Sequence, residues 1–111
     1  MTEPKRFHIA IAVADVAASV ADYSQRLGQE PEVVIAGAYA LWRTPQLNFS
    51  IRQTEPEQAG QLRHLGWEDP QAEAFECDRD CNGILWERFT ADQQATEILE
   101  LWPDTQYQSE L

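Results

Sequence analysis

Bulky apolar residues alternate with smaller ones in the first stretch of the chain. Over residues 7–13 the bulky side chains of Phe7, Ile9, Ile11 and Val13 fall on one face, and His8 falls on the other face with Ala10 and Ala12. This alternation predicts a β-strand, because successive side chains of a strand point to opposite sides. The bulky face needs an element to cover it, and we expect a helix directly afterwards.

That helix is predicted from its spacing and from its two ends. Apolar residues recur at intervals of four, three and four positions, at Val16, Val20, Tyr23 and Leu27. Asp15 is suited to accept hydrogen bonds from the first free N–H groups of a helix, and Gly28 is suited to end it. The sequence therefore predicts one amphipathic helix between Asp15 and Gly28.

Three further strands complete the first half of the chain. They are predicted over residues 33–35, 38–43 and 47–52, and turn-forming residues separate them. In the last of these strands Asn48, Ser50 and Arg52 share the face opposite the apolar side chains. The order of elements in the first half is βαβββ.

The second half begins with a similar strand, after a polar segment over residues 53–61. Residues 62–67 place His64 and Gly66 on the face opposite the bulky Leu65 and Trp67. This strand thus repeats the first one, in which a histidine also shares its face with small residues.

The other second-half elements are predicted as one helix and two strands. Asp69-Pro70 is typical of a helix start and Asn82-Gly83 of a helix end, with Cys77 and Cys81 on the packed side between them. Strands are predicted over residues 84–90 and 96–102, and the segment 91–95 has no assignment. In the final strand Glu100 shares a face with Thr96, Ile98 and Trp102, whereas Glu97 lies on the opposite face.

The two histidines of the chain are its only ones, and they stand about 56 residues apart, one near the head of each half. Such a repeat predicts that the two imidazoles meet at one site. A carboxylate beside them would complete a metal-binding group, and we expect Glu100 to supply it. Two alternatives stay open: the register of the final strand decides between Glu100 and Glu97, and both histidines could be ordinary, partly buried polar residues.

Composition narrows the class of protein. A length of 111 residues fits one domain, residues 1–111, and 19 acidic against 8 basic residues give a formal net charge of −11. Because this charge repels phosphate backbones, we expect no nucleic-acid partner. No stretch approaches the roughly 18 apolar residues of a membrane span, so we expect no membrane partner either. Two cysteines do not make a disulfide scaffold and favour a cytoplasmic protein.

With these elements the chain resembles the vicinal oxygen chelate superfamily, which includes glyoxalase I, extradiol dioxygenases and bleomycin-resistance proteins. The resemblance rests on the two histidine-bearing halves, on residues 15–28 and on the Glu-Leu-Trp sequence at 100–102. It implies an α+β fold in which two βαβββ modules, residues 5–53 and 61–103, form an eight-stranded open cup, the glyoxalase/bleomycin-resistance/dioxygenase fold. It also implies a homodimer.

The resemblance further implies a site on the concave side of the cup. Residues His8, His64 and Glu100 would hold one divalent metal ion. The substrate site would be lined by Asn48, Ser50, Arg52 and Trp102. Because Asn48 and Ser50 supply no second anionic ligand, Fe²⁺ or Mn²⁺ is favoured over the Zn²⁺ or Ni²⁺ of glyoxalase-type chemistry.

Two functions are compatible with this site. The first is a small metal-dependent enzyme, dioxygenase-like or lyase-like, that acts on a small-molecule substrate chelated through two adjacent oxygens. The second is a non-catalytic protein of the bleomycin-resistance type, which binds a small molecule in the same cup and needs no metal. The sequence names neither the substrate nor the reaction.

Overall fold

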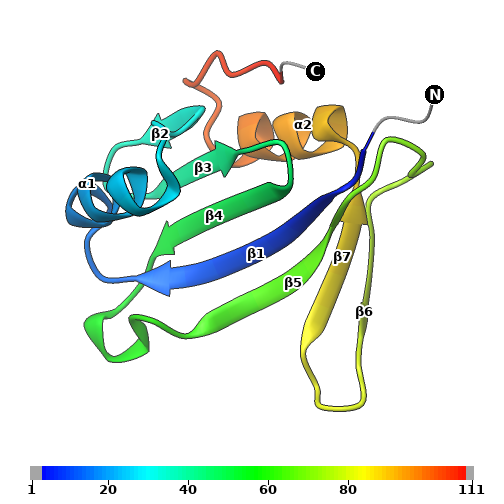
Figure 1. The fold of residues 1–111 in the computed structure, drawn as a ribbon, viewed down its shortest axis with the longest axis horizontal. Coiled ribbons are helices and arrows are strands. Elements are labelled where there is room, and N and C mark those ends of the chain that lie inside the picture. Colours follow the sequence, from blue (N-terminus) through cyan, green and yellow to red (C-terminus); the bar gives the residue numbers. More distant parts are fainter. Residues whose placement is uncertain (1–3, 110–111) are drawn as a thin grey trace.

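A single twisted β-sheet runs through the computed structural model, which describes residues 4–109 (Figure 1). The protein is of the α+β class, and its seven strands follow the order β2-β3-β4-β1-β5-β7-β6 across the sheet. The elements are β1 (Arg6–Val13), α1 (Val16–Leu27), β2 (Val33–Ile35), β3 (Tyr39–Arg43), β4 (Leu47–Gln53), a short 3-10 helix (Pro56–Gln58), β5 (Leu62–Glu68), β6 (Glu76–Arg79), β7 (Leu85–Phe89) and α2 (Ala91–Leu101).

The first half folds as its pattern predicts, with the element order β1, α1, β2, β3, β4. The Asp15 side chain accepts a hydrogen bond from the Ala18 N–H at the start of α1. At the other end Gly28 adopts a left-handed conformation with φ of 76°. The predicted cap and the predicted stop of this helix are therefore both confirmed.

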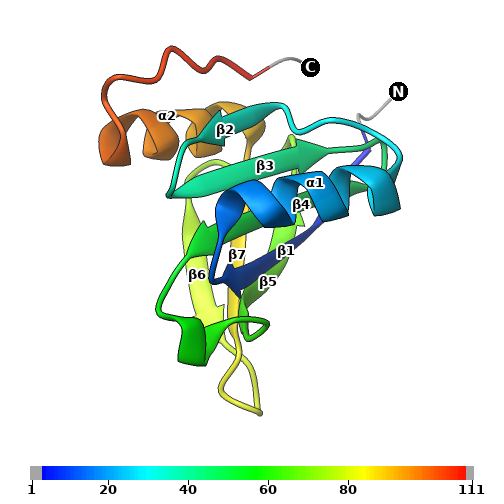
Figure 2. The same ribbon diagram turned by 90° about the vertical axis from the view of Figure 1, so that its left-hand side faces the viewer.

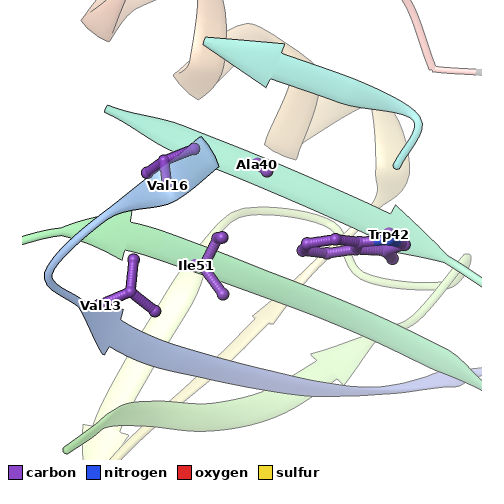
Figure 3. Packing of buried hydrophobic residues seen from close by; sticks show 5 residues of the cluster. All are labelled: Val13, Val16, Ala40, Trp42 and Ile51. Carbon is purple, nitrogen blue, oxygen red and sulfur yellow. The ribbon is translucent and has the colours of Figure 1, made fainter. Parts of the chain in front are cut away.

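Helix α1 covers the face of the sheet that carries Ile9, which we call the outer face. Val16 of α1 packs there against a buried cluster of side chains from β1, β3 and β4 (Figure 3), namely Val13, Ala40, Trp42 and Ile51. The opposite side of the sheet, which carries His8, is the inner face. On the inner face, Ala95 and Ile98 of α2 pack against Tyr39 and Leu41 of β3. The two helices therefore lie on opposite sides of the sheet (Figure 2).

The two halves meet at the centre of the sheet, where β1 and β5 pair antiparallel. β1 pairs parallel with β4, which pairs antiparallel with β3; in the same way β5 pairs parallel with β7, which pairs antiparallel with β6. Strand pairing thus repeats in the two halves. Within residues 4–109 the second half has no counterpart of β2, so the sheet has seven strands and not the expected eight.

The prediction of a helix between Asp69 and Gly83 is wrong. Asp69 caps a single turn, in which the Ala72 N–H donates to the Asp69 carbonyl at 3.0 Å. The chain then forms strand β6, which contains Cys77, and Cys81 follows in the turn after it; both cysteines are exposed. Asn82-Gly83 belongs to the hairpin turn between β6 and β7, because Gly83 has a φ of 81° and its N–H donates to the Asp80 carbonyl.

The strand expected over residues 96–102 is also wrong, because this segment belongs to helix α2. Thr90 and Gln93 form a capping box at the start of the helix, in which each side chain accepts a hydrogen bond from the backbone N–H of the other. The buried residues of α2 recur at helical spacing, at Ala91, Gln94, Ala95 and Ile98. Neither helix of the described part of the chain is long and apolar enough to cross a membrane.

Candidate metal centre

Three potential ligand atoms converge on the inner face, from β1, β5 and β7. The two Nε2 atoms of His8 and His64 are 2.9 Å apart. The Glu87 Oε1 atom lies 3.1 Å from His64 Nε2 and 3.8 Å from His8 Nε2. Among the residues that the structure describes, this is the one group of three or more His, Cys, Asp or Glu side chains placed to hold a metal ion.

The triangle formed by these atoms has the right size for one ion. Its three sides define a circle with a radius of about 1.9 Å, slightly shorter than the roughly 2.0–2.2 Å bonds that imidazole and carboxylate form to transition metals. An ion just above the plane of the three atoms would therefore contact all of them without any movement of the backbone.

The position of both histidines follows from the pairing of β1 with β5. His8 pairs with Gly66 and His64 pairs with Ala10, so each imidazole has a small residue opposite to it. Such residues are diagonal neighbours on one face, within reach of each other's side chains. The prediction that the two histidines share one face of the sheet is therefore confirmed.

A buried hydrogen-bond network fixes the proton on His8. The His8 Nδ1 atom lies 2.8 Å from Asn48 Oδ1 and 3.1 Å from the Asn48 carbonyl oxygen. Asn48 Nδ2 donates to Glu68, whose carboxylate can only accept, so the amide oxygen must face His8. His8 Nδ1 therefore carries the proton and Nε2 presents its lone pair to the site, as a metal ligand requires.

The orientation of Asn48 is itself held from two sides. Glu68 accepts hydrogen bonds from Arg43 at 2.7 and 2.8 Å and from Arg6 at 2.7 Å. Although burial opposes its charge, the hydrogen bonds from Arg43 and Asn48 lower the pKa of the Glu68 carboxyl. Gln94 of α2 forms a reciprocal amide pair with Asn48. The sequence prediction placed Asn48 in the substrate site, whereas the structure places it behind His8.

Burial lowers the pKa of His8 from 6.5 to about 4, and the neighbouring His64 contributes in the same direction. His8 is only 2% exposed. Its imidazole consequently stays neutral at physiological pH, and a neutral imidazole is the form that binds a metal ion.

Glu100 lies outside this group. It is an exposed residue of helix α2, since the strand on which its prediction depended is not formed. Glu97 belongs to the same helix and lines the pocket next to the histidines. Burial and then the charge of Glu87 raise the pKa of the Glu97 carboxyl. The structure thus brings Glu87 to the histidines, in place of either carboxylate considered from the sequence.

A signal for Glu87 was present in the chain. Residues 84–90 were predicted as a strand, and Glu87 is the one carboxylate in that segment. Residues two positions after each histidine have equivalent partners in the sheet: Ala10 pairs with Ser50, and Gly66 pairs with Glu87. Ser50 therefore occupies the position in the first half that Glu87 occupies in the second.

The three ligand atoms border a pocket of about 150 Å³ between the sheet and α2. Three of the predicted substrate-site residues line it, namely Ser50, Arg52 and Trp102. The Arg52 guanidinium lies 5.4 Å from the centre of the Trp102 ring, a cation–π contact. Arg63, which the sequence prediction did not include, lines the same pocket.

Comparison with known proteins does not assign the chain to a family. No protein-family model matches the sequence, and no curated protein matches it.

Proposed function

We propose that the protein is a metal-dependent enzyme in which His8, His64 and Glu87 bind one divalent ion. The observation that carries the proposal is the triangle of ligand atoms with sides of 2.9, 3.1 and 3.8 Å. Two neutral donors and one anionic donor on one side of an ion leave about half of an octahedral shell open. When bound, the ion would supply Lewis acidity and open positions for the adjacent oxygens of a small substrate.

The residues around the triangle support a cation at its centre. His8 Nε2 and Glu87 Oε1 both accept hydrogen bonds, and both face the single nitrogen His64 Nε2. In the metal-free protein a proton on His64 Nε2 forms the hydrogen bond to His8 Nε2, and Glu87 Oε1 lies 3.1 Å from His64 Nε2 as an ion-pair contact. A divalent ion would replace this proton and satisfy all three atoms, which is why we infer a metal site and not only a polar network.

Fe²⁺ or Mn²⁺ suits this group better than Zn²⁺ or Ni²⁺. Ser50, at the position equivalent to Glu87, supplies no second carboxylate, so the group stays at two imidazoles and one carboxylate. This composition is typical of open sites that bind a chelating substrate or dioxygen. The reaction we propose is therefore dioxygenase-like or lyase-like, and the fold we propose is that of the vicinal oxygen chelate superfamily.

The test is elemental analysis of protein purified without chelator or affinity tag, followed by titration with Mn²⁺ under anaerobic conditions. We expect one transition-metal ion per chain. Glu87→Gln and His64→Ala should each lower the affinity for Mn²⁺ at least about tenfold, because each removes a ligand.

Glu100→Gln is the matched control, because it makes the same chemical change on the exposed side of α2. It should leave Mn²⁺ binding unchanged. If the protein binds no transition metal, the metal-dependent enzyme is excluded, and a non-catalytic small-molecule binder takes its place.

A further inference from the structure

A β-bulge lies next to the candidate metal centre, where β1 pairs with β5. The regular pairing of Ala10 with His64 is followed by a pairing of Ile11 with Leu62, so Arg63 is an extra residue in β5. Beyond it, the Ala12 N–H donates to the Gln61 carbonyl at 2.9 Å, and the shifted register continues. In a regular strand Arg63 and His64 would point to opposite faces, but a bulge lets consecutive side chains reach the same side.

The result of the bulge is that Arg63 and His64 line one pocket. Arg52 reaches this pocket from β4, where its stack on the Trp102 ring holds the guanidinium in place. Two arginines from different strands thus face the space beside His8, His64 and Glu87.

Most of the other arginines have a carboxylate partner, and Arg79 donates to the Gly83 carbonyl oxygen at 2.8 Å. Within residues 4–109, neither Arg52 nor Arg63 has a carboxylate oxygen within 4.0 Å, although acidic residues outnumber basic ones by 19 to 8. Ion pairs with carboxylates are formed by Arg6, Arg26, Arg43 and Arg88. Two half-buried guanidinium groups in one pocket repel each other unless an anion joins them.

The charge of the pocket points in the same direction. Its negative residues are Glu87 and Glu97, and its arginines are Arg52 and Arg63. These four charges cancel, so a divalent ion at the metal centre leaves the pocket with a net charge of two positive units. A negatively charged ligand would compensate this excess, in a space where solvent screens it less than at the surface.

We propose that Arg63 and Arg52 bind the anionic group of a small substrate whose oxygen donors reach the metal ion. This inference rests on the proposed function. The pocket volume of about 150 Å³ resembles cavities that hold a single benzene ring. Aromatic side chains line it beside the arginines, namely Tyr39, Phe75, Phe89 and Trp102. The substrate class is therefore a small carboxylate or similar anion, of about the size of one substituted ring.

Two probe molecules that differ in charge test this inference. 3,4-Dihydroxybenzoate carries two adjacent oxygens and a carboxylate, whereas 3,4-dihydroxybenzamide carries the same oxygens without the charge. Binding of each to Mn²⁺-loaded protein is measured by anaerobic calorimetry. We expect the acid to bind at least about tenfold more tightly than the amide. The reason is that hydrogen bonds from the two guanidinium groups are stronger to a charged carboxylate than to a neutral amide.

Arg63→Gln should abolish most of the preference for the acid, while amide affinity and Mn²⁺ stoichiometry stay unchanged. Arg52→Gln should reduce the same preference, which keeps the inference testable if one variant folds poorly. Arg26→Gln is the matched control: it removes the same charge from exposed helix α1 and should preserve the preference.

The outcomes separate this inference from the proposed function. If Mn²⁺ binds but acid and amide bind equally, or if Arg63→Gln keeps the preference, the arginine site is refuted and the metal site stands. If no Mn²⁺ binds, the proposed function fails, and the two probes are titrated into metal-free protein. If the metal-free protein prefers the acid and Arg63→Gln removes this preference, the arginine site is supported. If the metal-free protein shows no such preference, the arginine site is refuted.

Discussion

The outer faces of the two halves differ in what covers them. In the first half, helix α1 covers Trp42 and Ile51, which are completely buried. Both lie in one cluster with Val16 of that helix (Figure 3). In the second half no helix of the described chain covers Trp67 and Trp86, and Trp67 is 39% exposed. The two halves share their strand pairing, but only the first one has a complete hydrophobic core.

The inner faces of the two halves differ in how accessible their ligand side chains are. The first half supplies His8, which is buried and oriented by Asn48. The second half supplies the more accessible ligands, since the side chains of His64 and Glu87 are 12% and 14% exposed. It also supplies Arg63 through its bulge. The first half thus orients the buried ligand and contributes Arg52 to the pocket, and the second half carries the more accessible ligands and Arg63.

The largest effect that we predict tests this difference in packing. Trp42→Ala should lower the free energy of unfolding by about 3–5 kcal/mol, because it opens a cavity in a packed core. Trp67→Ala should lower it by less than about 1 kcal/mol, because Trp67 is not enclosed. Urea unfolding of both variants measures the two values. Equal losses would mean that the second half is packed as tightly as the first.

The next effect concerns protonation of the buried ligand. The pKa of His8 is about 4 in the folded protein and 6.5 in the unfolded chain. Between these values the unfolded chain binds a proton that the folded protein does not, so the contribution of His8 to stability is fully present above pH 6.5 and is lost as the pH decreases towards 4. The loss from this group is on the order of 3 kcal/mol.

The measurement is urea unfolding of metal-free protein at pH 7.5 and pH 4.5, for the wild type and for His8→Gln. The variant controls for other groups that titrate in this range. Its stability should depend on pH less steeply than that of the wild type. The same slope in both proteins would refute a buried neutral His8.

We expect a substitution at Gly66 to cause a smaller loss of stability but a large loss of metal affinity. A Cβ atom at this position would lie 2.1 Å from the Glu87 carbonyl oxygen, so β7 would have to move away from β5. Gly66→Ala should cost about 1–3 kcal/mol of stability and should also weaken metal binding, because Glu87 is displaced from the histidines. Calorimetry with Mn²⁺ and urea unfolding measure both effects. A variant with full metal affinity would show that β7 adjusts without moving Glu87.

The smallest effect on the free chain concerns assembly. We still predict the homodimer that the sequence resemblance implies, and the outer face of the second half is the surface that a second copy would cover. Trp67→Glu should therefore give a monomer in light scattering at micromolar concentration, with the fold retained. Ala17→Glu on exposed helix α1 is the control and should leave the dimer intact. A wild-type protein that is already monomeric would reject this prediction.

Most of the first half could be predicted from sequence because its strands alternate and its helix has clear ends. In the second half, the secondary-structure prediction was wrong at two points. In residues 96–102 polar and apolar side chains do not alternate, and the capping box of Thr90 and Gln93 starts a helix there. Asn82-Gly83 fits either a helix end or a hairpin turn, and only the pairing of β6 with β7 decides between them.

The candidate site was predictable to a similar extent. The two histidines followed from the repeat, and Ser50, Arg52 and Trp102 line the pocket as expected. The carboxylate was missed because its assignment depended on the last strand, which is β7 and not residues 96–102. Arg63 was missed because the alternation rule assigns it to the face opposite His64, and a single-residue bulge has no signature in this sequence.

The central claim is that the two halves together bind one metal ion at His8, His64 and Glu87. Its most direct test is anomalous X-ray diffraction from crystals of the protein grown with Mn²⁺. We predict one anomalous peak per chain, at about 2.0–2.2 Å from both Nε2 atoms and from a Glu87 carboxylate oxygen. A peak at any other group of side chains, or no peak in crystals saturated with Mn²⁺, would contradict the claim.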